Sequence, residues 1–451
     1  MRNLCKYEQY KVLKNNFITE VPISWDMIKL KYVANIYNGN SLNDDYKLQF
    51  ESENDEELPY IASKDINVET TEINYQNGTR IPKNFENLKI APKYSSLLCI
   101  EGGSAGRKMG FTNQDVYFVN KLACFNVEDE VTSKFIFYIL QSNHFQSQFY
   151  NALTGLIGGV SLSNLRNFNF PLPSIQEQFS IVYFLNQQTF LIDEIINRKE
   201  KQIELLKEKQ QAIINEAVTK GLDPNIKIKD SGIDWLGKIP TDWKVTKSKH
   251  LTNLITDGAH ISPDTSSDDF PFISTVDLTR GEIDWNSCLK TTKESYEYLV
   301  RTGCKPIIND ILYSKDGTIG KTTVITENKE FVVASSLIII RPKPDLINPF
   351  YFEYLLRSNV INYQIDRLLS GVALRRISLE KFSNLQLILP PLQIQNQILE
   401  SLQSSNATFL KTLDALRTQI GKLKEYRQSI ISEAVTGKID VRDWQSNNSS
   451  N

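Results

Sequence analysis

The feature that most constrains this chain is a long amphipathic stretch that it carries twice. The first copy covers residues 176–221 and the second residues 395–438, and a shift of 217 positions brings their apolar seams into register. Spacings of four and three alternate through both copies, which is the repeat of a coiled-coil seam rather than of a broad core face. Both copies end in Glu-Ala-Val-Thr with a glycine close behind, a helix stop signal. A helix that is apolar only along a narrow stripe needs a partner, so we expect each copy to pair with the other.

The alternative for these stretches is two unrelated amphipathic helices in a globular core. That interpretation does not explain why the seam keeps its register over 217 residues. We therefore predict an interface between the two helices. The seam residues predicted to form it are Ile192, Ile196, Ile203, Leu206, Ile213, Leu413, Leu416, Ile420, Leu423 and Ile430.

Shorter matches flank both stretches at nearly the same offset. Residues 21–25 (Val-Pro-Ile-Ser-Trp) match 239–243 (Ile-Pro-Thr-Asp-Trp), and residues 103–107 (Gly-Ser-Ala-Gly-Arg) match 317–321 (Gly-Thr-Ile-Gly-Lys). A repeat period of about 200 residues indicates a duplicated pair of domains, because solenoid repeats have periods of ~20–50 residues. The predicted order is a lead-in at 1–20, a globular unit at 21–174, a helix at 175–220, a linker at 221–238, a second globular unit at 239–392, a second helix at 393–438 and a flexible tail at 439–451.

Each globular unit has a mixed pattern that predicts the α+β class. Short segments rich in branched and aromatic residues indicate strands, and turn residues separate them. The predicted strands include 96–100, 116–119 and 331–340, and the predicted helices include 131–143 and 349–359.

Composition excludes several classes of protein. No apolar run approaches the ~20 residues that span a bilayer, and the first 20 residues lack the apolar middle of a signal peptide, so we expect a cytoplasmic protein without membrane contact. Five scattered cysteines without a Cys-x-x-Cys pair argue against a disulfide framework and a zinc site, and three histidines leave little for metal or triad chemistry. The net charge of −2 does not favour nucleic acid, so a DNA surface would need its basic residues gathered on one face.

Two motifs resemble catalytic signatures without completing them. Residues 317–322 end like a phosphate-binding loop, but Lys315 stands where that loop needs glycine, so a turn between strands is the better interpretation. Residues 348–351 (Asn-Pro-Phe-Tyr) resemble the tetrad of adenine methyltransferases but lack its second proline. A helix that begins with an Asn cap and a Pro in its first turn explains them better. We predict no catalytic residue and no metal ligand.

Basic residues recur in both units. Arginine can bind guanine with two hydrogen bonds and lysine can neutralise phosphate, although the default interpretation of any single one is an ordinary solvated surface charge. The candidate DNA-binding residues are Lys64, Arg107, Lys108, Lys121, Lys315, Lys321, Arg375 and Arg376.

These pieces together resemble the specificity subunit of type I restriction–modification enzymes. The resemblance is carried by residues 229–243 (KDSGIDWLGKIPTDW), 315–321 (KDGTIGK), 389–397 (LPPLQIQNQ) and 171–178 (PLPSIQEQ), and it spans nearly the whole chain. It implies two target-recognition domains that each read one part of a split DNA site, and two antiparallel helices between them. It also implies a non-catalytic chain. Methyltransferase subunits, normally two, would bring S-adenosylmethionine, and motor–nuclease (restriction) subunits would use ATP and Mg²⁺.

Length and divergence fit that resemblance. A seam of ~26 residues rises ~39 Å, close to the ~34–36 Å of one DNA turn, so the helix pair could set the gap between two readers. Residues 74–77 (Asn-Tyr-Gln-Asn) and 282–285 (Glu-Ile-Asp-Trp) differ widely on a shared framework, as expected for readers of an asymmetric site. A protein-interaction scaffold with paired helices is the main alternative, and an enzyme with an unrecognised site is the other.

Overall fold

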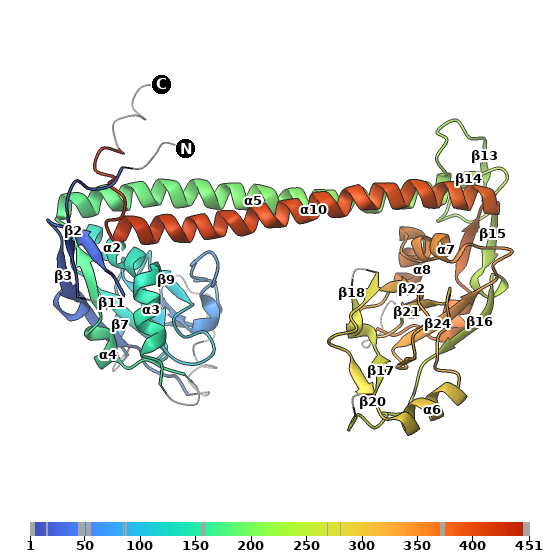
Figure 1. Ribbon diagram of the computed structural model, residues 1–451, viewed down its shortest axis with the longest axis horizontal. Helices are drawn as coiled ribbons and strands as arrows, with labels where there is room; N and C mark the ends of the chain where they lie inside the picture. Colours follow the sequence, from blue (N-terminus) through green and yellow to red (C-terminus); the bar gives the residue numbers. More distant parts are fainter. Residues whose placement is uncertain are drawn as a thin grey trace. The chain divides into compact units, whose positions relative to one another are not determined.

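A computed structural model gives the fold as two compact units (Figure 1). It describes residues 5–14, 17–43, 50, 56–83, 85, 88–154, 158–267, 269–279, 281–369 and 375–444. Unit 1 consists of residues 1–199 together with 417–451, and unit 2 consists of residues 200–416. Each long helix therefore contributes one half to each unit.

Unit 1 contains two four-stranded sheets. The first has the strand order β4-β11-β8-β9, and the second has the order β6-β5-β10-β7 with β10 parallel to β5. Buried apolar side chains from both sheets, such as Leu97, Cys124 and Phe118, form one core cluster. The elements are β4 (Asn35–Asn38), β5 (Leu58–Ile61), β6 (Arg80–Ile81), β7 (Ile90–Ala91), β8 (Ser96–Cys99), β9 (Met109–Phe111), β10 (Val116–Phe118), β11 (Leu122–Asn126), α2 (Glu130–Gln141), α3 (Asn143–Asn151) and α4 (Leu162–Arg166).

Unit 2 repeats this topology with different residues. Its four-stranded sheet has the order β16-β24-β21-β22, and its second sheet has the order β20-β17-β23 with β23 parallel to β17. The elements are β16 (Thr252–Asp257), β17 (Phe270–Ile273), β18 (Leu278–Thr279), β19 (Glu282–Ile283), β20 (Leu289–Thr291), α6 (Lys293–Arg301), β21 (Ile311–Ser314), β22 (Thr322–Val324), β23 (Val332–Val333), β24 (Leu337–Pro342), α7 (Pro349–Leu356), α8 (Asn359–Leu369) and α9 (Leu379–Ser383). The duplication predicted from the sequence is thus present in the fold.

Two sequence expectations need correction at their boundaries. The segment 331–340, predicted as one strand, forms β23 and β24, because the first part pairs with β17 and the second with β21 in the other sheet. The helix predicted at 131–143 ends at Gln141, because the Ser142 side chain accepts a hydrogen bond from the backbone N–H of Phe145 and begins α3.

A pair of strands closes each unit before its long helix. In unit 1, β3 (Asp26–Lys29) pairs antiparallel with β12 (Asn169–Leu172), and α5 (Ile175–Lys220) follows. In unit 2, β15 (Lys244–Lys247) pairs antiparallel with β25 (Gln386–Leu389), and α10 (Leu392–Val435) follows. The two long helices confirm the helices predicted from the heptad pattern.

Within unit 1, α5 and α10 pair antiparallel. Asp193 binds Arg427, and Lys199 donates to Gln419 at 2.6 Å, so residue numbers rise along one helix as they fall along the other. The seam residues Ile192, Ile196, Ile420 and Ile430 are buried in this unit, and Leu423 is half-buried.

Within unit 2, the other halves of the helices pair around Gln210, which donates to Asn406. Leu413 and Leu416 are buried, and Ile203 and Leu206 are half-buried. At the end of α5 the buried residue is Ile214, with 3% of its surface exposed, whereas the predicted seam residue Ile213 is 37% exposed. The reason is that this end of α5 packs on the globular core as well as on α10, so its buried face turns toward Ile214, Ala217 and Val218.

Each long helix ends in a glycine that packs against a buried tryptophan. Gly221 and Gly437 have φ angles of 83° and 72°, the left-handed conformation that favours glycine at a helix end. A Cβ on Gly221 would lie 3.3 Å from the Trp243 ring, and one on Gly437 would lie 3.3 Å from the Trp25 ring. The helix ends with Glu-Ala-Val-Thr and a nearby glycine and the Pro-x-x-Trp starts, both recognised in the sequence, therefore meet in both units.

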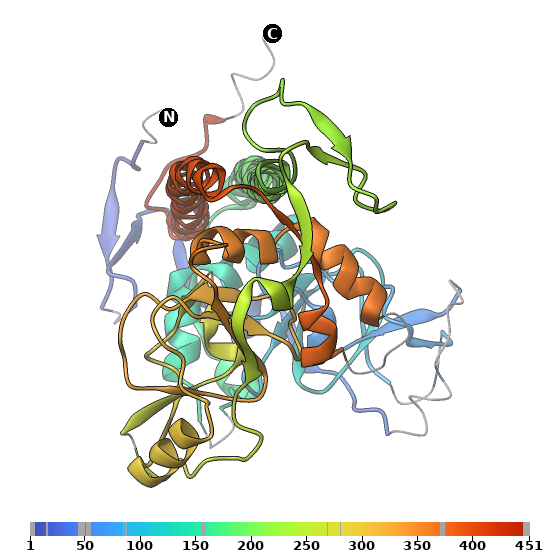
Figure 2. The same cartoon turned by 90° about the vertical axis from the view of Figure 1, so that its right-hand side faces the viewer.

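The lead-in and the linker form equivalent hairpins. In unit 1, β1 (Tyr10–Val12) pairs with β2 (Glu20–Pro22), and the Tyr10 hydroxyl donates to the Gly437 carbonyl at 3.0 Å. In unit 2, β13 (Ile228–Asp230) pairs with β14 (Lys238–Pro240), and Figure 2 shows this lime-green hairpin at the edge of the unit.

Residues 439–444, which the sequence assigned to the flexible tail, pack against unit 1. Ile439 and Val441 are buried, and the Trp444 ring lies edge-on to Phe184 with centroids 4.8 Å apart. The rest of the predicted tail, 445–451, lies outside the described residues.

Candidate nucleic-acid interface

One lysine in each unit braces a turn, residues 62–65 in unit 1 and 274–277 in unit 2. Each turn precedes a loop that we call the divergent loop, which runs to residue 77 in unit 1 and to residue 285 in unit 2. The Lys108 ammonium donates to the Ser63 carbonyl at 2.7 Å, and the Lys321 ammonium donates to the Thr275 carbonyl at 3.0 Å. Ser63 and Thr275 occupy matching positions in the two units. By this contact Lys321 corresponds to Lys108, whereas the sequence match had aligned Lys321 with Arg107. Both lysines were predicted to bind DNA, and both are half-buried and already engaged with backbone.

An aspartate closes each of these turns. The backbone N–H of Ala62 donates to Asp65 at 2.8 Å, and that of Ser274 donates to Asp277 at 2.7 Å. Both carboxylates are buried and fix the chain where the divergent loop begins.

A second set of matched contacts attaches each globular unit to a long helix. Gln428 donates to the Gln141 carbonyl in unit 1, and Gln211 donates to the Arg357 carbonyl at 3.0 Å in unit 2. These contacts lie at the end of α2 and α7, and the glutamines are 217 positions apart in the repeat. The braced turn, its aspartate and the glutamine contact therefore occur in both units, and we call this shared set of contacts the frame.

The remaining basic candidates of unit 1 are exposed. Lys64 lies in the braced turn and Lys121 between β10 and β11, and the described residues give neither an ion pair. Arg107 is also exposed, and its guanidinium donates to the Gly103 carbonyl at 2.8 Å. This arrangement is compatible with the predicted DNA contacts of unit 1.

The basic candidates of unit 2 are in a different state, and for Lys315 the sequence prediction fails. Lys315 is 3% exposed, and its ammonium forms an ion pair with Asp257. The carboxylate compensates the buried charge, so this lysine is not available at the surface for DNA. Burial acts to raise the pKa of Asp257, but Lys315 and His260 outweigh it and hold that pKa below its usual value. Arg376 pairs with Asp316 at 3.0 Å, and Arg375 pairs with Asp366, although both arginines stay more than half exposed.

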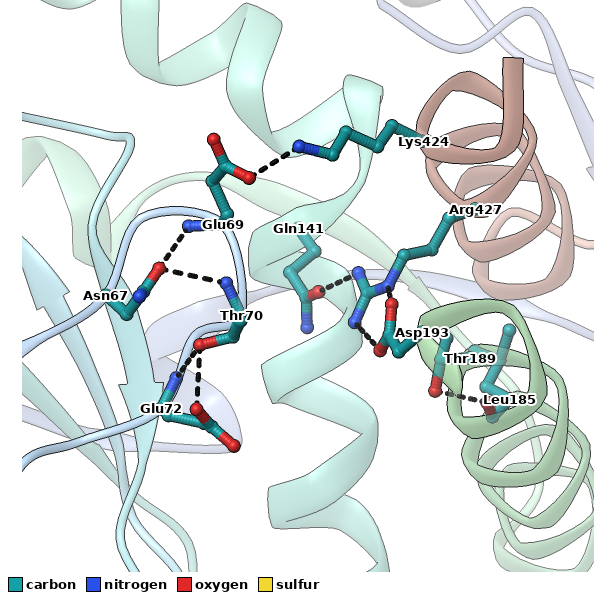
Figure 3. A network of polar contacts seen from close by, with 10 residues as sticks. All are labelled: Asn67, Glu69, Thr70, Glu72, Gln141, Leu185, Thr189, Asp193, Lys424 and Arg427. Carbon is teal, nitrogen blue, oxygen red and sulfur yellow. Dashed lines mark hydrogen bonds and ion pairs between the residues drawn. The ribbon is translucent and has the colours of Figure 1, made fainter. Parts of the chain in front are cut away.

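Unit 1 has an 810 Å³ cavity between the divergent loop, β9 and α2. Figure 3 shows the loop that forms one wall: Asn67 accepts hydrogen bonds from the backbone N–H groups of Glu69 and Thr70, and Glu69 pairs with Lys424 of α10. The lining residues are Lys64, Asp65, Asn67, Thr70, Thr71, Glu72, Ile73, Asn74, Tyr75, Phe111, Asn113, Lys134 and Phe137.

Unit 2 has a 580 Å³ cavity at the matching place, between its divergent loop, β22 and α7. Trp285 stands on the loop, with the Lys329 ammonium 4.4 Å from the centre of its ring. Glu353 of α7 accepts hydrogen bonds from Thr322 at 2.6 Å and from Arg357 at 3.3 Å. The two cavities thus share their walls and differ in the side chains that line them.

Sequence reasoning did not select Lys134 or Glu353, and it named Trp285 only as part of the divergent segment 282–285. For the two charged residues the available signal was a single charge beside or within an apolar helical run: Lys134 precedes the run Phe-Ile-Phe-Tyr-Ile-Leu, and Glu353 lies within Phe-Tyr-Phe-Glu-Tyr-Leu-Leu. A charged residue in such a run has to be paired or to face a cavity, because burying it alone is unfavourable.

The two motifs set aside in the sequence analysis have structural roles. Asn348 is the N-cap of α7, and its side chain accepts from the backbone N–H of Phe350 at 2.9 Å, as predicted. Residues 317–320 form the turn between the antiparallel strands β21 and β22, also as predicted.

Neither metal-ligand clusters nor membrane spans are found in the described part of the chain. No group of three or more His, Cys, Asp or Glu side chains there could hold a metal ion, and no described helix is long and apolar enough to cross a bilayer. All five cysteines are free, and burial raises the pKa of the Cys124 thiol to about 11, which opposes its ionisation.

The fold and the cavities together define a class of protein. It is a tandem pair of recognition domains on paired helices, in which the two domains share their fold and differ in the side chains that line their cavities. Comparison with known proteins gives the family. The family model described as "Type I restriction modification DNA specificity domain" matches residues 22–205 and 240–424, and the chain belongs to this family with two copies of its domain. It is accordingly a non-catalytic specificity subunit with two target-recognition domains.

Relatives and a solved structure cover nearly the same length. The specificity subunit of type I restriction enzyme EcoBI from Escherichia coli is 23% identical over 441 residues, which are 96% of this chain and 90% of that protein. The EcoKI specificity subunit from E. coli K12 is 20% identical over 461 residues, covering 95% and 92% of the two chains. A chain from a solved structure of complex assembly and conformational transition in the type I R-M system superposes with a TM-score of 0.68 at 15% identity, over 93% of this chain and 99% of the other. At that identity the superposition shows a common fold.

Proposed function

We propose that each unit reads one part of a bipartite, asymmetric DNA site and that the chain brings this specificity to a methyltransferase and a restriction subunit. The observation that carries the proposal is the repeated frame with a divergent lining. The braced turn, the aspartate cap and the glutamine contact occur in both units, whereas Lys134 and Phe137 of one cavity are matched by Phe350 and Glu353 in the other. Two domains that hold the same loops in the same way but present different groups suit two different half-sites.

Partner subunits supply the chemistry in this proposal. We propose two methyltransferase subunits that use S-adenosylmethionine and restriction subunits that use ATP and Mg²⁺, acting with this chain in the cytoplasm. An exposed stripe on α5 supports a docked subunit: Phe179 and Phe190 are 50% and 65% exposed, and Tyr183 lies between them on the same helix face. Exposed aromatic side chains in a row are typical of a protein interface.

Methylome sequencing tests the proposal directly. A host that carries this gene and a neighbouring methyltransferase gene is compared with a host that lacks only this gene. We expect a split, asymmetric motif that is methylated only when the chain is present. Replacing residues 21–174 by the corresponding unit of a relative should change one half of that motif and leave the other half unchanged. Identical methylation with and without the chain contradicts the proposal and favours the scaffold alternative.

A further inference from the structure

Lys134 in unit 1 is a cation that the fold holds in place, and no described residue forms an ion pair with it. Its ammonium lies over three aromatic rings, 4.1 Å from the centre of Phe111, 4.7 Å from Phe137 and 5.8 Å from Tyr138. Aromatic faces attract a cation but accept its N–H groups poorly, so three strong donors stay available. Within the described parts of the chain, no carboxylate or hydrogen-bond acceptor contacts this ammonium.

The open side of this ammonium is the 810 Å³ cavity, whose lining suits part of a nucleotide. Lys64 supplies a second cation, and the side-chain amides of Asn67, Asn74 and Asn113 also line it. The two lining carboxylates are already engaged: Asp65 accepts from the Ala62 N–H at 2.8 Å, and the Thr70 hydroxyl donates to Glu72 at 3.1 Å. Both carboxylates keep their charge, but among the described residues the ammonium groups of Lys64 and Lys134 have no carboxylate partner, so the cavity can still donate to a ligand that carries acceptor atoms.

The walls of the cavity are held in position before any ligand arrives. Figure 3 shows the loop tied to itself through Asn67 and Thr70 and tied to α10 through the Glu69–Lys424 ion pair. Thr71 within this loop has a φ of 60°, a strained conformation for a β-branched residue that persists only where its surroundings impose it. On the opposite wall, the backbone N–H of Asn113 donates to the Tyr75 hydroxyl at 3.0 Å.

Unit 2 provides a control within the same molecule. Phe350 is the residue of unit 2 that matches Lys134. The two cations that line the unit 2 cavity have acidic partners: Arg357 binds Glu353 at 3.3 Å, and Lys329 binds Glu327 at 2.8 Å. The frame is the same in both units, so a cation required only by the frame should recur. Among the described residues, only the unit 1 cavity has a lysine without an acidic partner, and this points to a ligand of unit 1.

We propose that this cavity is a DNA-contact site of unit 1, in which Lys134 donates to an acceptor atom of the target, either a phosphate oxygen or a base edge. The proposal rests on the proposed function and adds to it a site and an anchoring residue. Burial lowers the pKa of Lys134 to about 8, so the ammonium has already lost much of its hydration in the free protein. A DNA acceptor would restore the lost hydrogen bonds, and the contact should therefore contribute more than an exposed lysine does.

A matched pair of variants tests the proposal. Lys134→Met keeps the length and the aromatic packing and removes the charge, whereas Lys93→Met removes a lysine that stacks on Tyr94 at 4.4 Å but lies fully exposed and outside the cavity. The complex with methyltransferase subunits is titrated with a duplex that carries the methylome-derived motif and with one whose unit 1 half is scrambled, each at several salt concentrations. Thermal melting of all proteins verifies folding.

We expect Lys134→Met to weaken binding to the motif about tenfold or more, and Lys93→Met to bind like the wild type. A loss confined to the intact motif assigns Lys134 to a base edge. An equal loss on both duplexes, with the log–log salt slope smaller by about one, assigns it to a phosphate.

If Lys134→Met binds both duplexes as tightly as the wild-type protein does, the inference is overturned and the proposed function is unaffected. If the wild-type protein itself does not distinguish the two duplexes, the proposed function is refuted. If Lys134→Met does not fold, Lys64→Met replaces it, because Lys64 lines the same cavity and its side chain is exposed. In that case, unchanged binding by a folded Lys64→Met overturns the inference.

Discussion

The two units make different use of the same polar position in the helix seam. In unit 1 this position is Arg427, which forms a double hydrogen bond with Asp193 at 2.8 and 3.2 Å. In unit 2 it is Gln210, 217 residues earlier, and it donates to Asn406. An ion pair and a neutral hydrogen bond both satisfy the polar groups of a helix seam, but a charged member of one pair does not fit a neutral partner from the other. The duplicated helices are therefore equal in geometry and distinct in chemistry.

The same contrast continues in the recognition domains. Unit 1 keeps lysines available at its divergent loop, with Lys64 exposed and Lys134 unpaired in the described structure, whereas the position of Lys64 in unit 2 is Val276, 78% exposed. Unit 2 pairs several of its cations with carboxylates, as at Lys315 and Asp257. The frame positions that hold each unit together agree, and the positions that face outward have diverged. Divergence of this kind separates the requirements of folding from those of recognition.

The largest change we predict comes from lengthening both helices by one heptad at paired positions. Seven residues rise ~10.5 Å, which corresponds to about three base pairs of DNA. If the helices set the distance between the half-sites, the methylated motif should gain about three unspecified positions between unchanged halves. Methylome sequencing reads this gap. An active variant with an unchanged gap would show that the helices do not set the spacing.

The tryptophans at the helix ends should contribute equally to the two units. Trp25 and Trp243 are fully buried, and each packs against the glycine that ends a long helix. Replacing either with alanine should destabilise its unit by about 3–5 kcal/mol, because a large cavity is left in the core. Denaturant unfolding of the two variants measures this. A cost for Trp243→Ala far below that for Trp25→Ala would break the equivalence of the units.

The two seam pairs should differ in stability and in response to salt. Asp193→Ala leaves the Arg427 guanidinium, which is mostly buried, without its carboxylate, so we expect a loss of about 1–2 kcal/mol. Asn406→Ala removes a neutral partner and should cost about 0.5–1.5 kcal/mol. High salt should reduce only the first loss, since screening weakens the ion pair. Equal salt responses in thermal unfolding would contradict this distinction.

The smallest predicted effect is a pH dependence confined to unit 1. Lys134 has its pKa lowered by burial to about 8, so its contact with DNA is fully present below that pH and is lost as the pH rises through it. Between pH 7 and 9 the wild type should lose up to about tenfold in affinity relative to Lys134→Arg, which stays charged.

Other groups around Lys134 bear on this comparison. Lys64, Asp65, Glu72 and Tyr75 line the same cavity, and Tyr138 lies beneath the ammonium. All of them are present in both proteins, so the difference between the two titrations isolates Lys134. Parallel curves would exclude titration of this lysine as a contributor to binding.

Prediction from sequence succeeded where the signal is local or repeated. The alternation of four and three along 176–221 and 395–438 predicted both long helices and their pairing, because a narrow apolar stripe can be buried only against a similar stripe. It selected Ile213 where the structure buries Ile214, because the heptad pattern does not include the globular core that the end of α5 also contacts.

Prediction of the site was less complete, since charge alone does not specify environment. Lys315 and Lys134 carry the same charge in the sequence, but Lys315 is paired with Asp257, 58 residues away, whereas Lys134 of α2 lies over Phe111 of β9. Lys108 and Lys321 were selected as DNA contacts, and the structure shows them bound to carbonyl groups of the braced turns.

The sequence by itself determined the duplication, the α+β class, the paired helices and the family. These follow from periodicity and from matched segments, which are properties of the chain read in order. Only the tertiary structure decided which cations are neutralised, which brace a turn and which face a cavity. The physical reason is that the state of a charge depends on the groups within a few ångströms of it, and the fold brings those groups from distant parts of the chain.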